Sequence, residues 1–195
     1  RNHFTVTEKL TMAFEMAESL AVLHGFRDGL IIHDDVQLCQ WLRLENGKLK
    51  LGDFNRAEIP AYNATSGQYC KYQNGEVFGN YRSPEEFADL PLTEGLDMFS
   101  FGNNIYALLT GLWVFYENSD DEVVHKKLIE GEIAYIDPRY EQRSYGEKKL
   151  VEILRRCWEY NPEKRINIFQ AVEMLREAVE ENAKLEAAAA KHGKK

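Results

Sequence analysis

Two aspartates on either side of a short predicted hairpin constrain this fold more than any other feature of the sequence. Residues 41–44 and 48–51 are expected to pair as antiparallel strands across Glu45-Asn46-Gly47, because Asn-Gly suits a type I′ turn. Asp35 precedes this hairpin and Asp53 follows it. Both carboxylates therefore lie at the mouths of strand-like segments, where phosphoryl-transfer chemistry can use them to activate a nucleophile and to hold a metal ion.

The length and composition predict one folded domain. The chain has 195 residues, and single domains commonly span about 100 to 200. Hydrophobic residues make up 44%, enough apolar surface to offset the entropy of ordering the chain. A net charge of -8 argues against nucleic acid or anionic membrane surfaces as partners. No apolar run approaches the roughly 20 residues of a membrane-spanning helix, so no membrane segment is expected.

The three cysteines show no pairing pattern. Cys39, Cys70 and Cys157 are far apart and lack the Cys-x-x-Cys spacing of a zinc site. Free thiols are typical of a reducing compartment, so we expect an intracellular, cytoplasmic location.

Helical periodicity accounts for most of the chain. Thr5-Val6-Thr7-Glu8 fits the capping-box pattern and opens an amphipathic helix that Gly25 closes. Further helices are expected at residues 83–88, 97–109, 121–129, 147–159 and 168–190. Residues 30–32 are β-branched and strand-like, while residues 57–80 form a long polar segment of the kind that is often functional or mobile. The expected fold class is α+β, mainly α with a small antiparallel β-hairpin.

Five short motifs occur along the chain in a fixed order. They are His-Asp-Asp-Val-Gln-Leu-Cys-Gln at 33–40, Asp-Phe-Asn at 53–55, Ser-Pro-Glu at 83–85, Asp-Met-Phe-Ser-Phe-Gly at 97–102 and Cys-Trp-x-x-x-Pro-x-x-Arg at 157–165. Together they resemble the C-terminal (large) lobe of a eukaryotic protein kinase. The resemblance implies such a lobe over residues 1–175, with the catalytic loop at 33–40 and the activation segment at 53–85. Residues 176–195 are expected to form a polar helical extension that projects into solvent or frays.

The resemblance assigns chemical roles to the two aspartates. Asp35 corresponds to the base that accepts the proton of a protein substrate's hydroxyl, and Asp53 corresponds to the Mg²⁺ ligand that bridges the phosphates of ATP. Gln37 and Gln40 stand at the positions of a phosphate-neutralising Lys and of the Asn that holds a second Mg²⁺. ATP and Mg²⁺ are therefore the implied cofactors, with Gln40 and Asp53 as their ligands.

The resemblance also implies structural roles for five residues. His33 is expected to pack near Phe54 in the catalytic loop. Glu85 and Arg165 are expected to form a buried ion pair that anchors the activation segment, for which the Arg fork is well suited. Asp97 is expected to accept backbone donors of the catalytic loop from the start of its helix.

Four positions depart from the family's pattern. Asp34 stands where most kinases carry an Arg that clamps a phosphorylated loop, which disfavours switching by phosphorylation at Thr65, Ser66, Tyr69 or Tyr72. Gln37 lacks the charge of Lys. Gln40 is one methylene longer than Asn, so metal geometry would suffer. Asn55 replaces a Gly, which Asn tolerates better than most residues if φ is positive.

Neither a Gly-rich loop nor a Val-Ala-Ile-Lys strand occurs in the sequence. In the family these elements form the N-terminal lobe that covers the nucleotide. Together with a first residue that is not Met, their absence leads us to expect a piece of a longer protein in which the N-terminal lobe is missing. The piece alone is expected to be inactive.

The resemblance leaves two functions open. A divergent kinase with weakened transfer and a catalytically inactive pseudokinase, which would hold a regulatory protein partner, both remain open. His33-Asp34 is also similar to the dyad of metal-dependent phosphohydrolases, but the other histidines do not supply a further ligand set. His24 and His125 are interpreted as packing or surface residues, and the aromatic residues Trp113, Phe115 and Tyr116 as core or surface.

Overall fold

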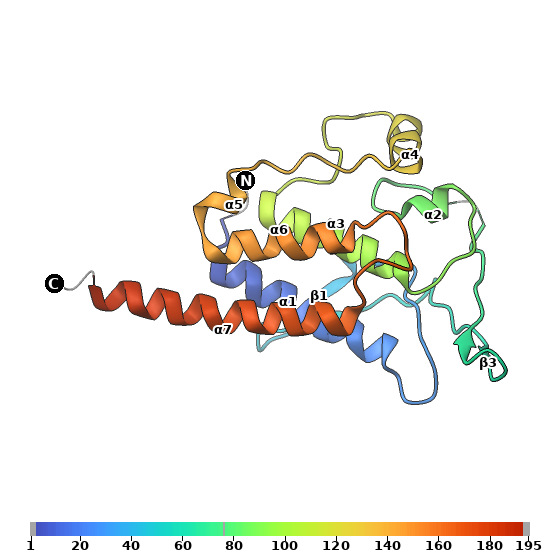
Figure 1. Cartoon of the computed structure of the whole chain (residues 1–195), viewed down its shortest axis with the longest axis horizontal. Coiled ribbons are helices and arrows are strands. Elements are labelled where there is room, and N and C mark those ends of the chain that lie inside the picture. Colours follow the sequence, from blue (N-terminus) through green and yellow to red (C-terminus); the bar gives the residue numbers. More distant parts are fainter. Residues whose placement is uncertain (1–2, 76, 193–195) are drawn as a thin grey trace.

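The computed structural model describes residues 3–75 and 77–192 and is mainly helical (Figure 1). The helices are α1 (Val6–His24), α2 (Pro84–Phe87), α3 (Gly95–Thr110), α4 (Asp121–Ile129), α5 (Tyr140–Arg143), α6 (Tyr145–Cys157) and α7 (Ile168–His192), with a 3₁₀ turn η1 (Leu38–Gln40). The strands form two separate antiparallel pairs, β1 (Trp41–Arg43) with β2 (Leu49–Leu51) and β3 (Tyr62–Asn63) with β4 (Gln68–Tyr69). The expected class, mainly α with a small β-hairpin, agrees with this content.

Helix α3 is the centre of the core. All of its residues except Thr110 are buried, and it packs against α1 and α6. Its left-handed Gly111, at φ 76°, ends the helix at the predicted place. Helix α7 lies along α1, as Figure 1 shows. Many of the largest fully buried side chains come from α1, α3 and α6; they include Leu10, Leu20, Met98, Phe101, Ile105, Leu109, Leu150 and Ile153.

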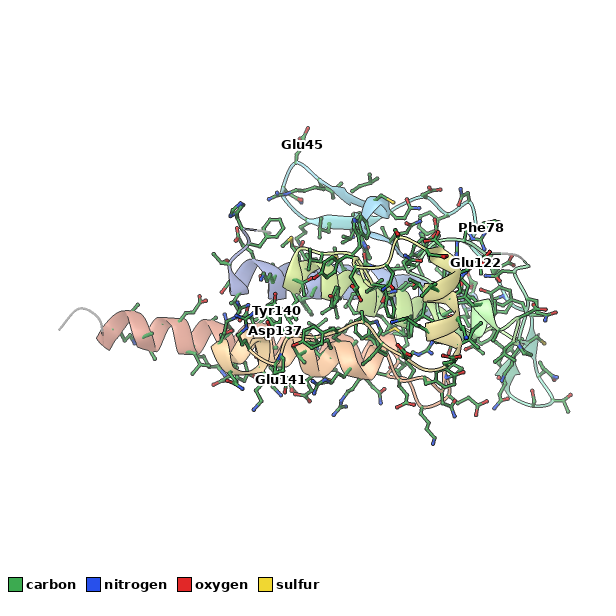
Figure 2. All side chains as sticks on the ribbon, turned by 90° about the horizontal axis from the view of Figure 1, so that it is seen from above. Glu45, Phe78, Glu122, Asp137, Tyr140 and Glu141 are labelled. Carbon is green, nitrogen blue, oxygen red and sulfur yellow. The ribbon has the colours of Figure 1, made fainter. Side chains whose placement is uncertain are left out.

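The hairpin between the two aspartates has the predicted strands but a different turn. Trp41 pairs with Leu51 and Arg43 with Leu49. A type I′ turn needs positive φ at both central residues, but only Gly47, at φ 82°, has one, and Asn46 does not. The predicted type I′ turn is therefore wrong. The connection is a three-residue loop that ends at the left-handed Gly47. The Gly47 amide donates a hydrogen bond to the Leu44 carbonyl at 2.9 Å and so closes the turn. Figure 2 shows Glu45 at its tip, away from the helices.

Residues 57–80 contain more order than a polar loop. The β3–β4 pair lies within them, Glu58 forms an isolated bridge with Ile32, and Tyr72 forms another with Leu92. The strand-like run at 30–32 thus contributes a single bridge and not a strand. These bridges were not predictable from local pattern because each joins residues at least 20 positions apart.

Several helix ends differ from prediction by one or two residues, and the C-terminal extension differs in its packing. Helix α6 begins two residues before the predicted 147, since Ser144 caps it by accepting a hydrogen bond from the Glu147 amide at 3.1 Å. The extension at 176–195 does not wholly project into solvent: Ala178 and Asn182 are buried against the body, and the Asn182 amide donates to the Thr7 hydroxyl at 2.9 Å. From residue 183 to residue 191 the helix is exposed, and it extends past the other elements (Figure 1).

None of the helices within residues 3–75 and 77–192 combines the length and apolar character that a bilayer crossing needs. Within the same residues the three cysteines are free thiols, with Cys157 buried and Cys39 and Cys70 exposed.

We expect Gly102→Ala to destabilise the protein although Ala is the better helix former. A Cβ at this position of α3 would lie 2.9 Å from the Cβ of Cys157 and from two atoms of the Trp158 indole. Overpacking of this kind costs about 1–3 kcal/mol, whereas the gain in helix propensity is about 1 kcal/mol. Urea denaturation should therefore show a lower free energy of unfolding. Glu177→Ala, on an exposed position of α7, is the control and should change it by less than about 0.5 kcal/mol. A variant of Gly102 as stable as the wild type would contradict the close packing of α3 on α6.

Candidate functional site

The carboxylate of Asp97 holds residues 33–40, the predicted catalytic loop, in place. Its two oxygens accept the backbone amides of His33 (2.8 Å) and Asp34 (2.9 Å), as the sequence predicts. A third partner was not predicted: the His24 ring nitrogen Nε2 lies 2.9 Å from Asp97 Oδ2, and both side chains are buried. His24 is therefore a buried polar partner at the end of α1. Only the proximity of two elements 73 residues apart shows this, and no local signal could have found it.

The rest of the loop packs as expected around His33. The ring centroids of His33 and Phe54 are 5.2 Å apart in an edge-to-face arrangement. His33 Nε2 lies 2.9 Å from the Gly52 carbonyl, so this histidine links the start of the loop to the end of β2. Phe54 is 49% exposed on its outer side.

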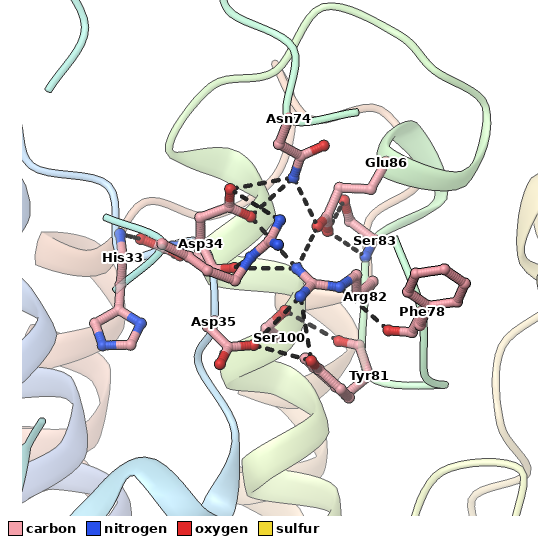
Figure 3. Close-up of polar contacts among 12 residues, drawn as sticks. His33, Asp34, Asp35, Asn74, Phe78, Tyr81, Arg82, Ser83, Glu86 and Ser100 are labelled. Carbon is pink, nitrogen blue, oxygen red and sulfur yellow. Dashed lines mark hydrogen bonds and ion pairs between the residues drawn. The ribbon is translucent and has the colours of Figure 1, made fainter. Parts of the chain in front are cut away.

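Four side-chain donors converge on Asp35, which is only 8% exposed. Figure 3 shows two of them, Tyr81 and Arg82. Its Oδ1 accepts hydrogen bonds from the Gln37 amide at 3.0 Å, the Tyr81 hydroxyl at 2.9 Å and the Arg82 guanidinium at 3.3 Å. Its Oδ2 accepts one from the Gln40 amide at 2.7 Å. Burial raises the pKa of Tyr81 to about 12, so the phenol is protonated and donates at neutral pH. The structure therefore brings Asp35, Gln37 and Gln40 together and adds two donors from the segment 53–85.

Asp53 differs from Asp35 in being exposed. No hydrogen bond or ion pair of its carboxylate occurs among the described residues. Its backbone is left-handed at φ 59°, whereas Asn55 has no positive φ, so the tolerance of Asn for that conformation is not needed at position 55. No group of three or more His, Cys, Asp or Glu side chains within residues 3–75 and 77–192 could hold a metal ion by itself.

Asp34 lies at the centre of a buried charged cluster that the sequence did not reveal. Its carboxylate accepts the Asn74 amide at 2.9 Å and lies 3.4 Å from Arg82 and 3.5 Å from Arg56. Glu86 is also buried, and its Oε1 lies 2.9 Å from Arg82 Nη1. Burial, with the nearby Glu86 carboxylate, raises the pKa of Asp34 to about 7, and Arg56, Asn74 and Arg82 oppose that rise. No signal in the sequence reveals this cluster, because the need of a buried carboxylate for a cation follows only once its burial is known.

Glu85 and Arg165 form the expected buried ion pair. Arg165 donates two hydrogen bonds to the Glu85 carboxylate, at 2.7 and 3.1 Å. Its remaining donors reach the carbonyls of Gly95 (2.7 Å), Glu159 (2.8 Å) and Tyr160 (3.2 Å). The pair therefore ties the end of the segment 53–85 to the start of α3 and to the connection between α6 and α7.

This geometry agrees with what comparison with known proteins finds. Residues 1–175 match the family model of the protein kinase domain, and the chain belongs to the protein kinase family. The kinase resemblance expected from the motifs is confirmed, while the assignment of individual catalytic roles remains a prediction.

Relatives from plants, animals and amoebae are similar at low identity. The calmodulin-binding receptor-like cytoplasmic kinase 2 of Arabidopsis thaliana is 28% identical over 158 residues, 77% of this chain and 38% of that protein. The calcium/calmodulin-dependent protein kinase type IV of Homo sapiens is 26% identical over 162 residues, 82% of this chain and 32% of that protein. The dual specificity protein kinase shkE of Dictyostelium discoideum is 25% identical over 181 residues, 90% of this chain and 23% of that protein. The chain thus spans well under half the length of each of these relatives.

Glu85→Gln is expected to lower the free energy of unfolding by about 3–5 kcal/mol, since it leaves the buried Arg165 without a counter-charge. Chemical denaturation measures the change. Glu163→Gln is the matched control, because Glu163 pairs with Lys71 on the exposed surface, at 3.3 Å. Exposed pairs contribute about 0–1 kcal/mol. Equal effects of the two substitutions would mean that the Glu85 pair does not anchor the fold.

The raised pKa of Asp34 predicts a specific pH dependence of stability. Between its ordinary value of 3.8 and about 7, the folded protein retains a proton on Asp34 that the unfolded chain has released. Stability therefore falls as pH rises through this window, by at most about 1.4 kcal/mol per pH unit from this group, and is level above it. Asp34→Asn removes this contribution.

The test of this dependence is the difference between the unfolding free energies of Asp34→Asn and of the wild type, measured from pH 4 to pH 8. The variant should gain stability relative to the wild type up to about pH 7, and the difference should then be constant. Taking the difference removes the contributions of groups that titrate equally in both proteins. A difference that does not vary with pH would mean that Asp34 is ionised throughout.

Proposed function

We propose that residues 1–175 are the large lobe of a divergent protein kinase. In the full-length protein it would transfer a phosphoryl group from ATP to a Ser, Thr or Tyr hydroxyl of a protein substrate. The observation that carries this proposal is the Tyr81 hydroxyl, which lies 2.9 Å from Asp35 Oδ1. A general base must lie about 2.6–3.2 Å from the hydroxyl whose proton it takes. The site therefore already holds one hydroxyl at the position that a substrate hydroxyl would need.

Asp35 accepts the proton of the attacking hydroxyl in this proposal. Asp97 fixes the backbone on which Asp35 lies, through the amides of His33 and Asp34. The Gln37 and Gln40 amides orient the Asp35 carboxylate from two sides. The proton acceptor is thus positioned before any substrate arrives, which is what positional catalysis requires.

Asp53 and Gln40 fit the needs of Mg²⁺ bound together with ATP. Mg²⁺ is usually held by one or two protein ligands, with phosphate oxygens and water completing its shell, and Asp53 offers an exposed carboxylate without a competing partner among the described residues. The ion would supply neutralisation of phosphate charge. Gln40 would contribute its side-chain oxygen, since its nitrogen donates to Asp35. Weak transfer is expected because Gln37 carries no charge.

One observation favours a second candidate, a pseudokinase that serves as a scaffold or regulatory binding module. Both oxygens of Asp35 are already engaged by side chains of this same chain, and Tyr81 and Arg82 come from the segment that a substrate would approach. If these contacts do not open, the fold binds partners without catalysis. A protein partner is implied in either case, and the N-terminal lobe would come from outside residues 1–195.

We further propose an intracellular location, supported by the free thiols and by the Arabidopsis relative named as a cytoplasmic kinase.

The full-length protein provides the test. A kinase should melt at a higher temperature with Mg-ATP, since a ligand that binds only the folded state stabilises it. Asp35→Asn and Asp53→Asn should each lower phosphate incorporation by at least about 100-fold. Asp28→Asn, on an exposed loop, is the control and should leave it unchanged. A thermal shift without phosphate transfer would favour the pseudokinase, and transfer that survives both substitutions would refute the assigned roles.

A further inference from the structure

Three carboxylates lie close together in the interior between the catalytic loop and α2. Asp34 is 2% exposed, Asp35 is 8% exposed and the Glu86 side chain is fully buried. Buried carboxylates are costly unless cations and hydrogen bonds satisfy them. The catalytic loop itself carries no cation between His33 and Gln40.

Arg82 supplies the buried cation for all three (Figure 3). Its Nη1 lies 2.9 Å from Glu86 Oε1 and 3.4 Å from Asp34 Oδ1, and also donates to the Asp34 carbonyl at 3.0 Å. Its Nη2 donates to Asp35 Oδ1 at 3.3 Å, and Nε donates to the Phe78 carbonyl at 3.3 Å. Although burial opposes ionisation of Arg82, Glu86 and the other neighbours raise its pKa, so the guanidinium is charged.

The backbone around Arg82 is firmly held. The Tyr81 carbonyl accepts hydrogen bonds from Ser100 Oγ (3.0 Å) and the Asn103 amide (2.7 Å), both on α3. Ser83 is the N-cap of α2. Its amide and its hydroxyl each donate a hydrogen bond to Glu86 Oε2, at 2.8 Å. The guanidinium is therefore presented from a rigid support, and its direction is fixed.

Two further groups of the segment 53–85 meet the catalytic loop at the same place. Arg56 Nε donates to the Asp34 carbonyl at 3.3 Å, and the Asn74 amide donates to both oxygens of the Asp34 carboxylate, at 2.9 and 3.1 Å. The start, middle and end of the segment thus converge on Asp34. A phosphate group on such a segment would normally supply negative charge for a cation of the loop. Here the signs are exchanged, with the anion on the loop and the cations on the segment.

We infer that Arg82 is a positioning residue that orients Asp35 and ties the segment 53–85 to the catalytic loop without any phosphate. The orientation of Asp35 rests on the proposed function, whereas the tie between segment and loop does not. Because each end of the contact is buried, the segment stays closed as synthesised. No modification of Thr65, Ser66, Tyr69 or Tyr72 is needed for it.

The experiment compares Arg82→Leu, Arg82→Lys and the wild type in the full-length protein. Backbone hydrogen exchange over residues 72–82 should become at least tenfold faster in Arg82→Leu, and the lysine variant should lie between the other two. Exchange in α1 and α7 should not change, which verifies that the variants fold. Arg139→Leu is the matched control, since Arg139 also pairs with a carboxylate, Asp137, but on the exposed surface.

A double variant separates pairing from simple loss of packing. Adding Asp34→Asn to Arg82→Leu removes one of the three carboxylates that lose their buried cation, so the exchange rate over residues 72–82 should fall at least threefold, back toward the wild-type rate. Phosphatase treatment of the wild type should leave this exchange unchanged. The inference is overturned if Arg82→Leu exchanges like Arg139→Leu, if the double variant shows no recovery, or if dephosphorylation alone loosens the segment tenfold.

Turnover tests the orientation of Asp35 separately. If the wild type transfers phosphate, Arg82→Leu should lower kcat at least tenfold while KM for ATP changes less than twofold, because the nucleotide ligands are untouched. An unchanged kcat would refute the positioning of Asp35. If the wild type transfers no phosphate while the exchange results hold, the proposed kinase activity and the orientation of its base fail together, and the tie between segment and loop stands.

Discussion

The buried carboxylate of Asp97 is the interaction on which the rest of the site depends. It receives the backbone amides of His33 and Asp34 and the ring of His24, so one side chain joins α1, α3 and the catalytic loop. A charge-assisted hydrogen bond is stronger than a neutral one, and inside the core it is not screened by water. Asp34 adopts a left-handed backbone at φ 58°, which costs free energy in a residue other than Gly. The two bonds to Asp97 offset that cost and turn the next residue, Asp35, toward the segment 53–85.

A second buried contact gives the segment its far anchor. Arg165 meets Glu85 beside α3, and Asp97 lies in the first turn of the same helix. The predicted catalytic loop and the end of the segment 53–85 are therefore both bonded to the start of α3, whose residues are buried over nearly its whole length. A displacement of this helix would move the catalytic loop and the segment together, so the distance between Asp35 and the donors of the segment is kept.

The sequence predicted what local chemistry determines and missed what only the fold brings together. The capping box at Thr5 and the stop at Gly111 are local, and both occur where expected. The Glu85–Arg165 pair was predictable only through family motifs, since 80 residues separate its members. Arg82 gives no such signal in the sequence. It lies just before the Ser-Pro-Glu motif, in a stretch without helical or strand periodicity. At position 34 the sequence shows that an Asp replaces the Arg of most kinases. That this carboxylate needs a cation from elsewhere in the chain follows only when its burial is known.

The exchange of charge at Asp34 also bears on whether a substrate can reach Asp35. The Tyr81 carbonyl is fixed by Ser100 and Asn103, but its phenol is held by Asp35, Arg82 and packing alone. In the proposed kinase, a substrate hydroxyl that replaced the phenol would form the same kind of hydrogen bond to Asp35, so the replacement would cost little in that contact. Arg82 has five other contacts and remains in place when the phenol leaves. Loss of the phenol would therefore cost Arg82 one hydrogen bond and its contact with the Tyr81 ring, but would leave its bonds to the loop and to Glu86. In the proposed kinase, closure of the segment would not by itself keep a substrate hydroxyl away from Asp35.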